Sequence, residues 1–225
     1  MTLLIIAFMF AVLEWVSEYK DMRWGICLAK PAMMAALIAW VLTYSHLLTS
    51  GSVFPRLWFV IGLVFCLAGD VFLLWTDQLF LPGLVSFLLG HIFYIISFRP
   101  IIPPQGAYLP ATAIALLLIV PGIIVYRKLY RGMKTSGKEK MRAPVLIYSV
   151  IITIMLYSAL TRGLGGAWIA TSAICVGAGA ALFYLSDILN AWKRFVGDFP
   201  NARLMIMMTY QLGQIALAVG MVLHW

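Results

Sequence analysis

The stretch Leu-Phe-Tyr-Leu-Ser-Asp-Ile-Leu at residues 182–189 places the carboxyl group of Asp187 within a long apolar segment. A second run, Cys-Leu-Ala-Gly-Asp-Val-Phe-Leu-Leu at residues 66–74, repeats the arrangement with Asp70. An ionised side chain is costly inside a membrane, so an ionisable residue within a membrane span marks a functional site. We expect these two carboxyl groups, the strongest chemical signal in the sequence, to form one site.

The composition is that of a protein that crosses a membrane several times. Of the 225 residues, 64% are hydrophobic and 11% are charged, and the mean hydropathy is +1.00. Soluble domains do not carry so much apolar surface. The apolar runs are too long and uniform for the alternating pattern of a barrel strand, so they predict an all-α fold. The net charge of +8 indicates loops that face anionic lipid rather than a nucleic-acid partner.

At about 20 residues per span, the chain is expected to contain eight transmembrane helices. The first lacks the basic region and cleavage site of a signal peptide, so we expect it to be retained. We expect residues 1–225 to form a single transmembrane domain. The expected helices cover 2–17, 24–44, 56–75, 79–98, 107–126, 143–160, 165–189 and 201–224.

The distribution of lysine and arginine predicts the orientation. All of these residues except Arg56, Arg99 and Arg162 lie in or beside the loops that follow odd-numbered helices. The positive-inside rule therefore places those loops in the cytoplasm and both termini on the other side. The long basic loop at 127–142 is expected to be a solvated linker that fixes this topology.

On this topology, six helices bring polar side chains to the cytoplasmic half or the middle of the membrane. We infer a single polar cavity that opens toward the cytoplasmic leaflet. Small residues at 177–181 allow close helix approach, so the seventh helix is expected to be central. The polar side chains are Glu14, Lys30, Asp70, His91, Tyr94, Asp187, Tyr210, Gln211 and Gln214.

Each of these residues also has a purely structural interpretation. Lys30 either snorkels to the interface or belongs to the site. Glu14 is expected to cap the first helix in the headgroup region. The two aspartates could instead be structural, paired with Lys30 or a basic loop residue. Hydrogen bonding between helices is the alternative for His91, Tyr94, Tyr210, Gln211 and Gln214.

A short internal similarity links the two aspartates. Gly69-Asp70-Val71 and Ser186-Asp187-Ile188 lie on parallel helices four spans apart. This spacing is compatible with a remnant repeat of two four-helix halves, as found in transporters.

Several reaction classes are disfavoured. The histidines His46, His91 and His224 lie on separate segments without the paired spacing of a zinc site, and no G-x-S-x-G or phosphate-binding glycine loop is present. We therefore expect no metal and no cofactor. Two carboxyl groups in a cavity of low dielectric constant remain, of which one donates a proton and the other stays ionised. An acid-labile enol ether in a lipid suits this chemistry.

Five of the expected helices together resemble the YhhN-type lysoplasmalogenase family of membrane proteins. The residues that carry the resemblance are Lys30-Pro31, Gly69-Asp70, Gly90-His91 with Tyr94, Ala181-Leu182-Phe183 before Ser186-Asp187, and Thr209-Tyr210 before Gln214.

This resemblance implies an eight-helix bundle of the inner membrane of a bacterial cell. It would hydrolyse the vinyl ether of a lysoplasmalogen, taken from the bilayer, with water, and release a fatty aldehyde and a glycerophospho-ethanolamine or -choline. By the resemblance Asp70 and Asp187 are the catalytic pair. The expected substrate-binding residues are Lys30, His91, Tyr94, Tyr210 and Gln214. The rival hypothesis is a proton-coupled transporter or lipid-binding protein that uses the same aspartates.

Overall fold

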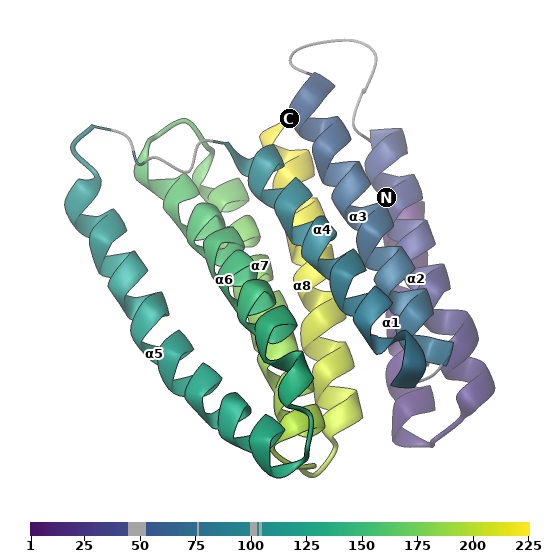
Figure 1. Cartoon of the computed structure of the whole chain (residues 1–225). Coiled ribbons are helices and arrows are strands. Elements are labelled where there is room, and N and C mark those ends of the chain that lie inside the picture. Colours follow the sequence, from purple (N-terminus) through teal and green to yellow (C-terminus); the bar gives the residue numbers. More distant parts are fainter. Residues whose placement is uncertain (45–52, 76, 100–102, 104) are drawn as a thin grey trace. The chain divides into compact units, whose positions relative to one another are not determined.

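The computed structural model describes residues 1–44, 53–75, 77–99, 103 and 105–225. In these residues all regular structure is helical, and eight helices are long and apolar enough to cross a membrane. The predicted all-α fold with eight spans is therefore confirmed, and the chain is an integral membrane protein. The long helices are α1 (Thr2–Tyr19), α2 (Arg23–Tyr44), α3 (Val53–Trp75), α4 (Phe80–Phe98), α5 (Tyr108–Thr135), α6 (Arg142–Leu160), α7 (Ala170–Phe195) and α8 (Ala202–His224) (Figure 1). Short 3-10 helices are η1 (Asp77–Leu79), η2 (Glu139–Met141) and η3 (Thr161–Leu164).

The helices group into two compact units. The first comprises Met1–Arg99 with Trp225 and contains α1 to α4, and the second comprises Pro100–His224 and contains α5 to α8. Within each unit, helices that follow one another in the chain pack together. That all 225 residues form one transmembrane domain stays a prediction.

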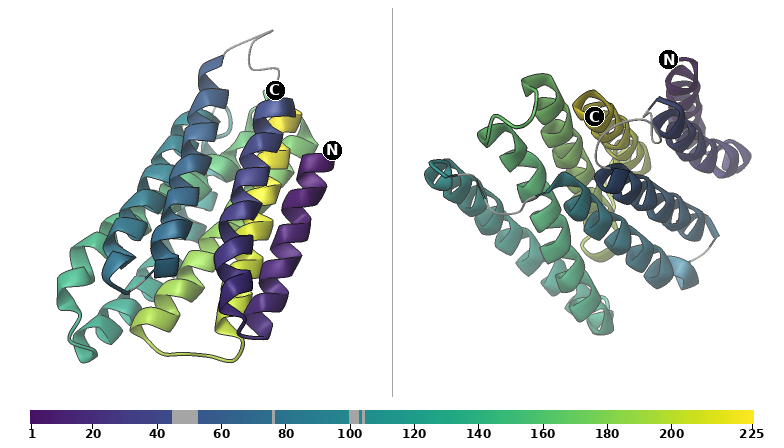
Figure 2. Two further views of the ribbon diagram at one scale, coloured as in Figure 1. Left: turned by 90° about the vertical axis from the view of Figure 1, so that its right-hand side faces the viewer. Right: turned by 90° about the horizontal axis from the view of Figure 1, so that it is seen from above.

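In the first unit, α1 and α2 form an antiparallel hairpin (Figure 2). Gly25 of α2 packs directly against the side chain of Ser17. The helices α3 and α4 meet through another pair of glycines. A Cβ atom on either Gly62 or Gly90 would lie 3.1 Å from the carbonyl oxygen of the other. The absence of these side chains lets the two backbones approach closely.

In the second unit, α7 and α8 meet in the same manner. A Cβ atom on Gly179 would lie 2.8 Å from the carbonyl oxygen of Gly213, and one on Gly213 would lie 2.9 Å from that of Gly179. The hydroxyl of Ser172 donates to the carbonyl of Gly220 at 2.5 Å. Since α7 also contacts α5 and α6, its predicted central position is confirmed within this unit.

Replacing Gly179 with alanine is expected to destabilise the protein. The new methyl group would lie 2.6 Å from the backbone nitrogen of Leu217, so α7 and α8 must separate. Overpacking of this kind costs about 1–3 kcal/mol. Thermal unfolding in detergent measures the loss against Gly122→Ala, whose Cβ would meet only the hydroxyl of Tyr184 at 3.6 Å. Equal unfolding temperatures for the two variants would contradict the proposed close contact.

The predicted loop at 127–142 is wrong over most of its length, because α5 continues to Thr135. Arginine, lysine and leucine favour the helix, which continues through Gly132 and ends before Gly137. Gly137 has a φ of 68°, and Lys138 N–H donates to the carbonyl of Met133 at 2.8 Å, so the helix ends in a Schellman motif. The buried residues of α5 are Ala111, Leu129 and Met133.

The seventh helix was also predicted with wrong ends. It begins at Ala170, instead of residue 165, and continues to Phe195 beyond the predicted end at residue 189. Phe195 is buried, and its carbonyl lies directly against Gly132 of α5. Asp187 therefore lies about 12 Å before the end of its helix, rather than at the end.

Candidate functional site

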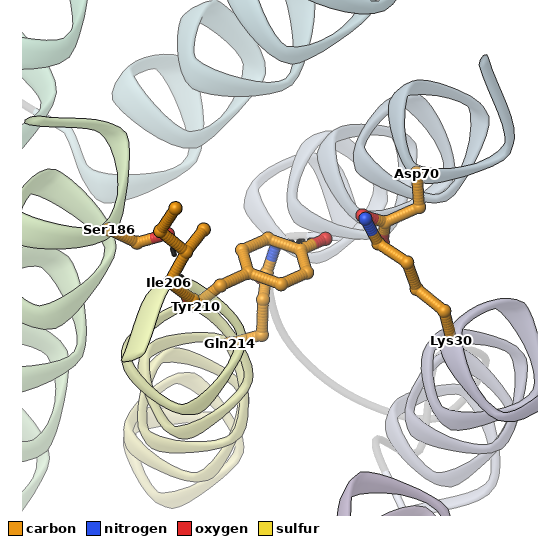
Figure 3. Close-up of polar contacts among 6 residues, drawn as sticks. All are labelled: Lys30, Asp70, Ser186, Ile206, Tyr210 and Gln214. Atoms are coloured by element: carbon orange, nitrogen blue, oxygen red, sulfur yellow. Dashed lines mark hydrogen bonds and ion pairs between the residues drawn. The ribbon is translucent and has the colours of Figure 1, made fainter. Parts of the chain in front are cut away.

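In the first unit, the carboxyl group of Asp70 forms an ion pair with Lys30. The ammonium nitrogen of Lys30 on α2 lies 3.4 Å from Oδ1 of Asp70 on α3, and the two side chains point toward one another (Figure 3). The exposed fractions are 8% for the side chain of Lys30 and 1% for that of Asp70. Lys30 is therefore buried beside Asp70 instead of snorkelling to the interface, as both a functional site and a purely structural pair would have it. Its membership of a functional site stays a prediction.

Glu14 is a second buried carboxyl group of this unit. It is completely buried on the face of α1 that also carries Ala7, Ala11 and Ser17. This face packs on α2, the helix of Lys30. The predicted position of Glu14 as a cap in the headgroup region is therefore wrong.

His91 and Tyr94 are both completely buried on α4. The ring of Tyr94 stacks on Phe59 of α3, with 5.0 Å between the ring centroids, and covers Gly62. Gly62 lies two helical turns before Asp70, or about 12 Å along α3. Tyr94 therefore packs against the middle of α3, and its predicted depth in the membrane stays a prediction.

In the second unit, Asp187 of α7 is partly exposed and contacts α6. The hydroxyl of Tyr148 donates to its Oδ2 at 2.6 Å, and Tyr148 is only 8% exposed. Sequence reasoning missed Tyr148, because a tyrosine in an apolar helix carries no signal that separates a site residue from a lipid-facing one. The neighbouring Ser186 faces α8 instead, where its hydroxyl donates to the carbonyl of Ile206 at 3.1 Å (Figure 3).

The polar residues of α8 are buried together. Tyr210 is 3% exposed, and Gln211 and Gln214 are completely buried. The side-chain amide of Gln214 lies 3.5 Å from the hydroxyl of Tyr210 (Figure 3). The ring of Tyr210 packs edge-to-face on Phe183 of α7, which is the contact between helices that the sequence allowed as its structural role.

The structure thus joins some predicted residues and adds others. It brings together Lys30 with Asp70, and Tyr210 with Gln214. Asp70 belongs to the first unit and Asp187 to the second, so their assembly into one site stays a prediction. Among the described residues, no group of three or more His, Cys, Asp or Glu side chains is placed to hold a metal ion. His46 lies outside the described residues.

Comparisons with known proteins agree with the resemblance seen in the sequence. Human lysoplasmalogenase TMEM86B is 29% identical over 215 residues, which cover 92% of this chain and 79% of the human protein. Bovine lysoplasmalogenase TMEM86A is 32% identical over 167 residues, or 72% of this chain and 64% of that protein. The lysoplasmalogenase of Mycobacterium tuberculosis is 27% identical over 171 residues, or 73% of this chain and 60% of that protein.

No solved structure matches this chain significantly. The model of the YhhN family matches residues 25–221, which include all seven residues predicted for the site. The match therefore extends from α2 to α8 and covers both units. We conclude that this chain belongs to the YhhN family.

Proposed function

We propose that this protein is a lysoplasmalogenase. It is an ether-bond hydrolase that cleaves the vinyl ether of a lysoplasmalogen to a fatty aldehyde and a glycerophospho-ethanolamine or -choline. The observation that carries the proposal is the similarity to lysoplasmalogenases of mammals and Mycobacterium. The alignment with the human protein covers 92% of this chain. The buried carboxyl groups supply the acid chemistry that this reaction requires.

The proposed mechanism is acid/base catalysis by Asp70 and Asp187. A carboxyl proton adds to the alkenyl carbon, so the carbon–carbon π bond becomes a carbon–hydrogen bond and an oxocarbenium ion forms. An ionised carboxylate stabilises this cation, as in glycosidases. Water then adds to the cationic carbon, and the hemiacetal collapses to aldehyde and glycerol hydroxyl. The buried ammonium of Lys30 supports this proposal, because it places a positive charge 3.4 Å from Oδ1 of Asp70.

We propose that the buried polar residues of α4 and α8 position the lysophospholipid and water. His91 and Gln214 are completely buried, and each offers donors and acceptors for the glycerol hydroxyl or for water. Tyr94 and Tyr210 add hydroxyl groups on the same two helices, α4 and α8. Lys30 completes the set as a cation that holds Asp70 or meets the phosphate.

The experiment that tests the function is incubation of the purified protein in lipid with lysoplasmalogen. We expect one free aldehyde for each glycerophospholipid head released. An ester-linked lysophospholipid of the same chain length is the control and should remain intact. Proton-coupled uptake into liposomes without any product would instead establish the transporter hypothesis.

We also propose that the basic end of the second unit faces the cytoplasm of a bacterial cell, at its inner membrane. The last turn of α5 carries Lys134, and the connection to α6 carries Lys138 and Lys140, which supports this orientation under the positive-inside rule. In a chain whose native cysteines are replaced, Ser136→Cys should react with an impermeant thiol reagent only in inside-out vesicles. Labelling of this cysteine in intact spheroplasts would show that the protein has the opposite orientation.

A further inference from the structure

The third helices of the two units are equivalent in register. In α3, Gly62 is the glycine that meets a glycine of the next helix, and Asp70 follows it by eight residues. Gly69, directly before Asp70, also touches α4 at the ring of Phe87. In α7, the glycine that meets a glycine of the next helix is Gly179, and Asp187 also follows by eight residues. Each aspartate therefore lies about 12 Å along its helix from this glycine pair. The short internal similarity in the sequence thus has a structural counterpart.

The fourth helices repeat the same register. Gly90 of α4 and Gly213 of α8 are the partners of the contact glycines, and each is followed directly by a completely buried polar residue. These residues are His91 in the first unit and Gln214 in the second. The third and fourth helices of the two units therefore match at these positions, which supports a correspondence between the two helix pairs.

The second helices complete the correspondence. Lys30 lies seven residues after the start of α2, and Tyr148 lies six residues after the start of α6. In each unit, this side chain reaches the aspartate of the third helix, at 3.4 Å for Lys30 and 2.6 Å for Tyr148. The second helix of each unit therefore supplies a partner of the carboxyl group from a comparable position, with a cation in one unit and a neutral hydroxyl in the other.

We infer that Tyr148 is the counterpart of Lys30 and that this difference divides the catalytic roles, an inference that rests on the proposed lysoplasmalogenase function. Asp187, held by Tyr148, carries the proton that is delivered to the vinyl ether. Asp70, held by Lys30, stays ionised and stabilises the oxocarbenium ion. Tyr148 is a positioning residue, since it acts through Asp187.

The chemistry of the two partners carries this division. An ammonium group carries a positive charge and only donates hydrogen bonds, so Lys30 is a partner suited to a carboxylate anion. A phenol hydroxyl is neutral and both donates and accepts, so Tyr148 can hold Asp187 in either protonation state. The second arrangement suits a carboxyl group that loses and regains a proton in every turnover, because its partner carries no charge.

Asp187 gives up one proton in the first step and regains one from water in each turnover. Its proton forms the new carbon–hydrogen bond, and the electron pair of the π bond is used in that bond. The attacking water gives one proton back to the Asp187 carboxylate as its oxygen bonds to the cationic carbon. Collapse of the hemiacetal moves its hydroxyl proton to the leaving glycerol oxygen, so water is the only molecule consumed besides the lipid.

Tyr148→Phe tests the positioning role. It removes the hydroxyl and retains the ring, so kcat should fall about tenfold while KM changes less than about twofold, because only the hydrogen bond to Asp187 is lost. Tyr184→Phe is the matched control, since Tyr184 lies on α7 one turn before Asp187 and its hydroxyl lies 3.5 Å from Thr153. An unchanged kcat in Tyr148→Phe would overturn the role of Tyr148.

A double-mutant cycle separates this role from a general effect on packing. In an Asp187→Ala background, Tyr148→Phe should cause no further loss of the residual activity, whereas in an Asp70→Asn background it should still cause the full tenfold loss. Equal additional losses in both backgrounds would show that Tyr148 acts through the fold alone, and would overturn the inference.

Exchanging the hydrogen-bond partner of Asp187 tests the division of catalytic roles between the two aspartates. Tyr148→Lys places an ammonium group beside Asp187, so the variant should lose activity about as much as Asp187→Asn. Near-normal turnover by this variant would overturn the division of roles. If the variant does not fold, the double-mutant cycle with Tyr148→Phe tests the division of roles instead. If the wild-type protein releases no aldehyde, the proposed function fails and the inference fails with it.

Discussion

Asp70→Asn and Asp187→Asn are each expected to lower kcat for lysoplasmalogen at least about 100-fold. The amide retains the shape of the carboxyl group but neither delivers a proton nor stabilises a cation by its charge, and general acid–base groups contribute factors of about 10²–10⁴. Aldehyde release by purified variants in lipid measures the loss. Wild-type turnover in either variant would rule out the proposed role of that aspartate.

The matched control for these variants is Asp198→Asn. Asp198 is an exposed residue after the end of α7, where its carboxylate accepts a hydrogen bond from the N–H of Phe199 at 2.9 Å. The same chemical change at that position should leave kcat within about twofold, because surface substitutions have small effects. A comparable loss there would mean that the assay reports protein quality rather than chemistry.

Lys30→Met is expected to cause the largest loss of stability. The substitution leaves the carboxylate of Asp70, which is 1% exposed, without its ammonium partner. Removing one member of a buried ion pair costs about 3–5 kcal/mol, because the remaining charge stays desolvated. The unfolding temperature in detergent or bicelles should fall accordingly, and an unfolding temperature equal to that of the wild type would contradict the buried pair.

The double variant Lys30→Met with Asp70→Asn separates folding from chemistry. Replacing both charged partners removes the isolated buried charge, so the unfolding temperature should recover most of the loss. Activity should remain as low as in Asp70→Asn, because the carboxylate is still missing. Recovery of both stability and activity would show that Asp70 serves only the fold.

The sequence correctly predicted the number of spans, which depends on the length of the apolar runs. It failed to predict helix ends, which depend on the helix propensity of the residues in the last turns. Eight spans follow from the hydrophobic runs, and their number is correct among the described residues. The C-terminal ends of α5 and α7 were missed because their last turns are basic and were interpreted as loop. These residues have good helix propensity, and α5 stops only where Gly137 adopts a positive φ.

The candidate site was predictable for charged residues and less so for neutral ones. A lysine or aspartate within a span stands out, because the membrane penalises it, and the pair of Lys30 with Asp70 follows from that reasoning. Glu14 lies near a helix end, where the sequence cannot separate burial between helices from the headgroup region. Tyr148 was missed because its importance depends on the residue that it faces, and only three-dimensional packing shows that partner.

The buried contacts of α5 have a consequence for the surroundings of this helix. Ala111 near its start, and Leu129 with Met133 near its end, are its buried residues, whereas many apolar side chains between them are exposed in the described structure. In a bilayer, the acyl chains of annular lipids therefore replace protein neighbours along the central turns of α5. Bilayer thickness and lipid composition act directly on the tilt of this helix, so it is the element most sensitive to transfer from lipid into detergent.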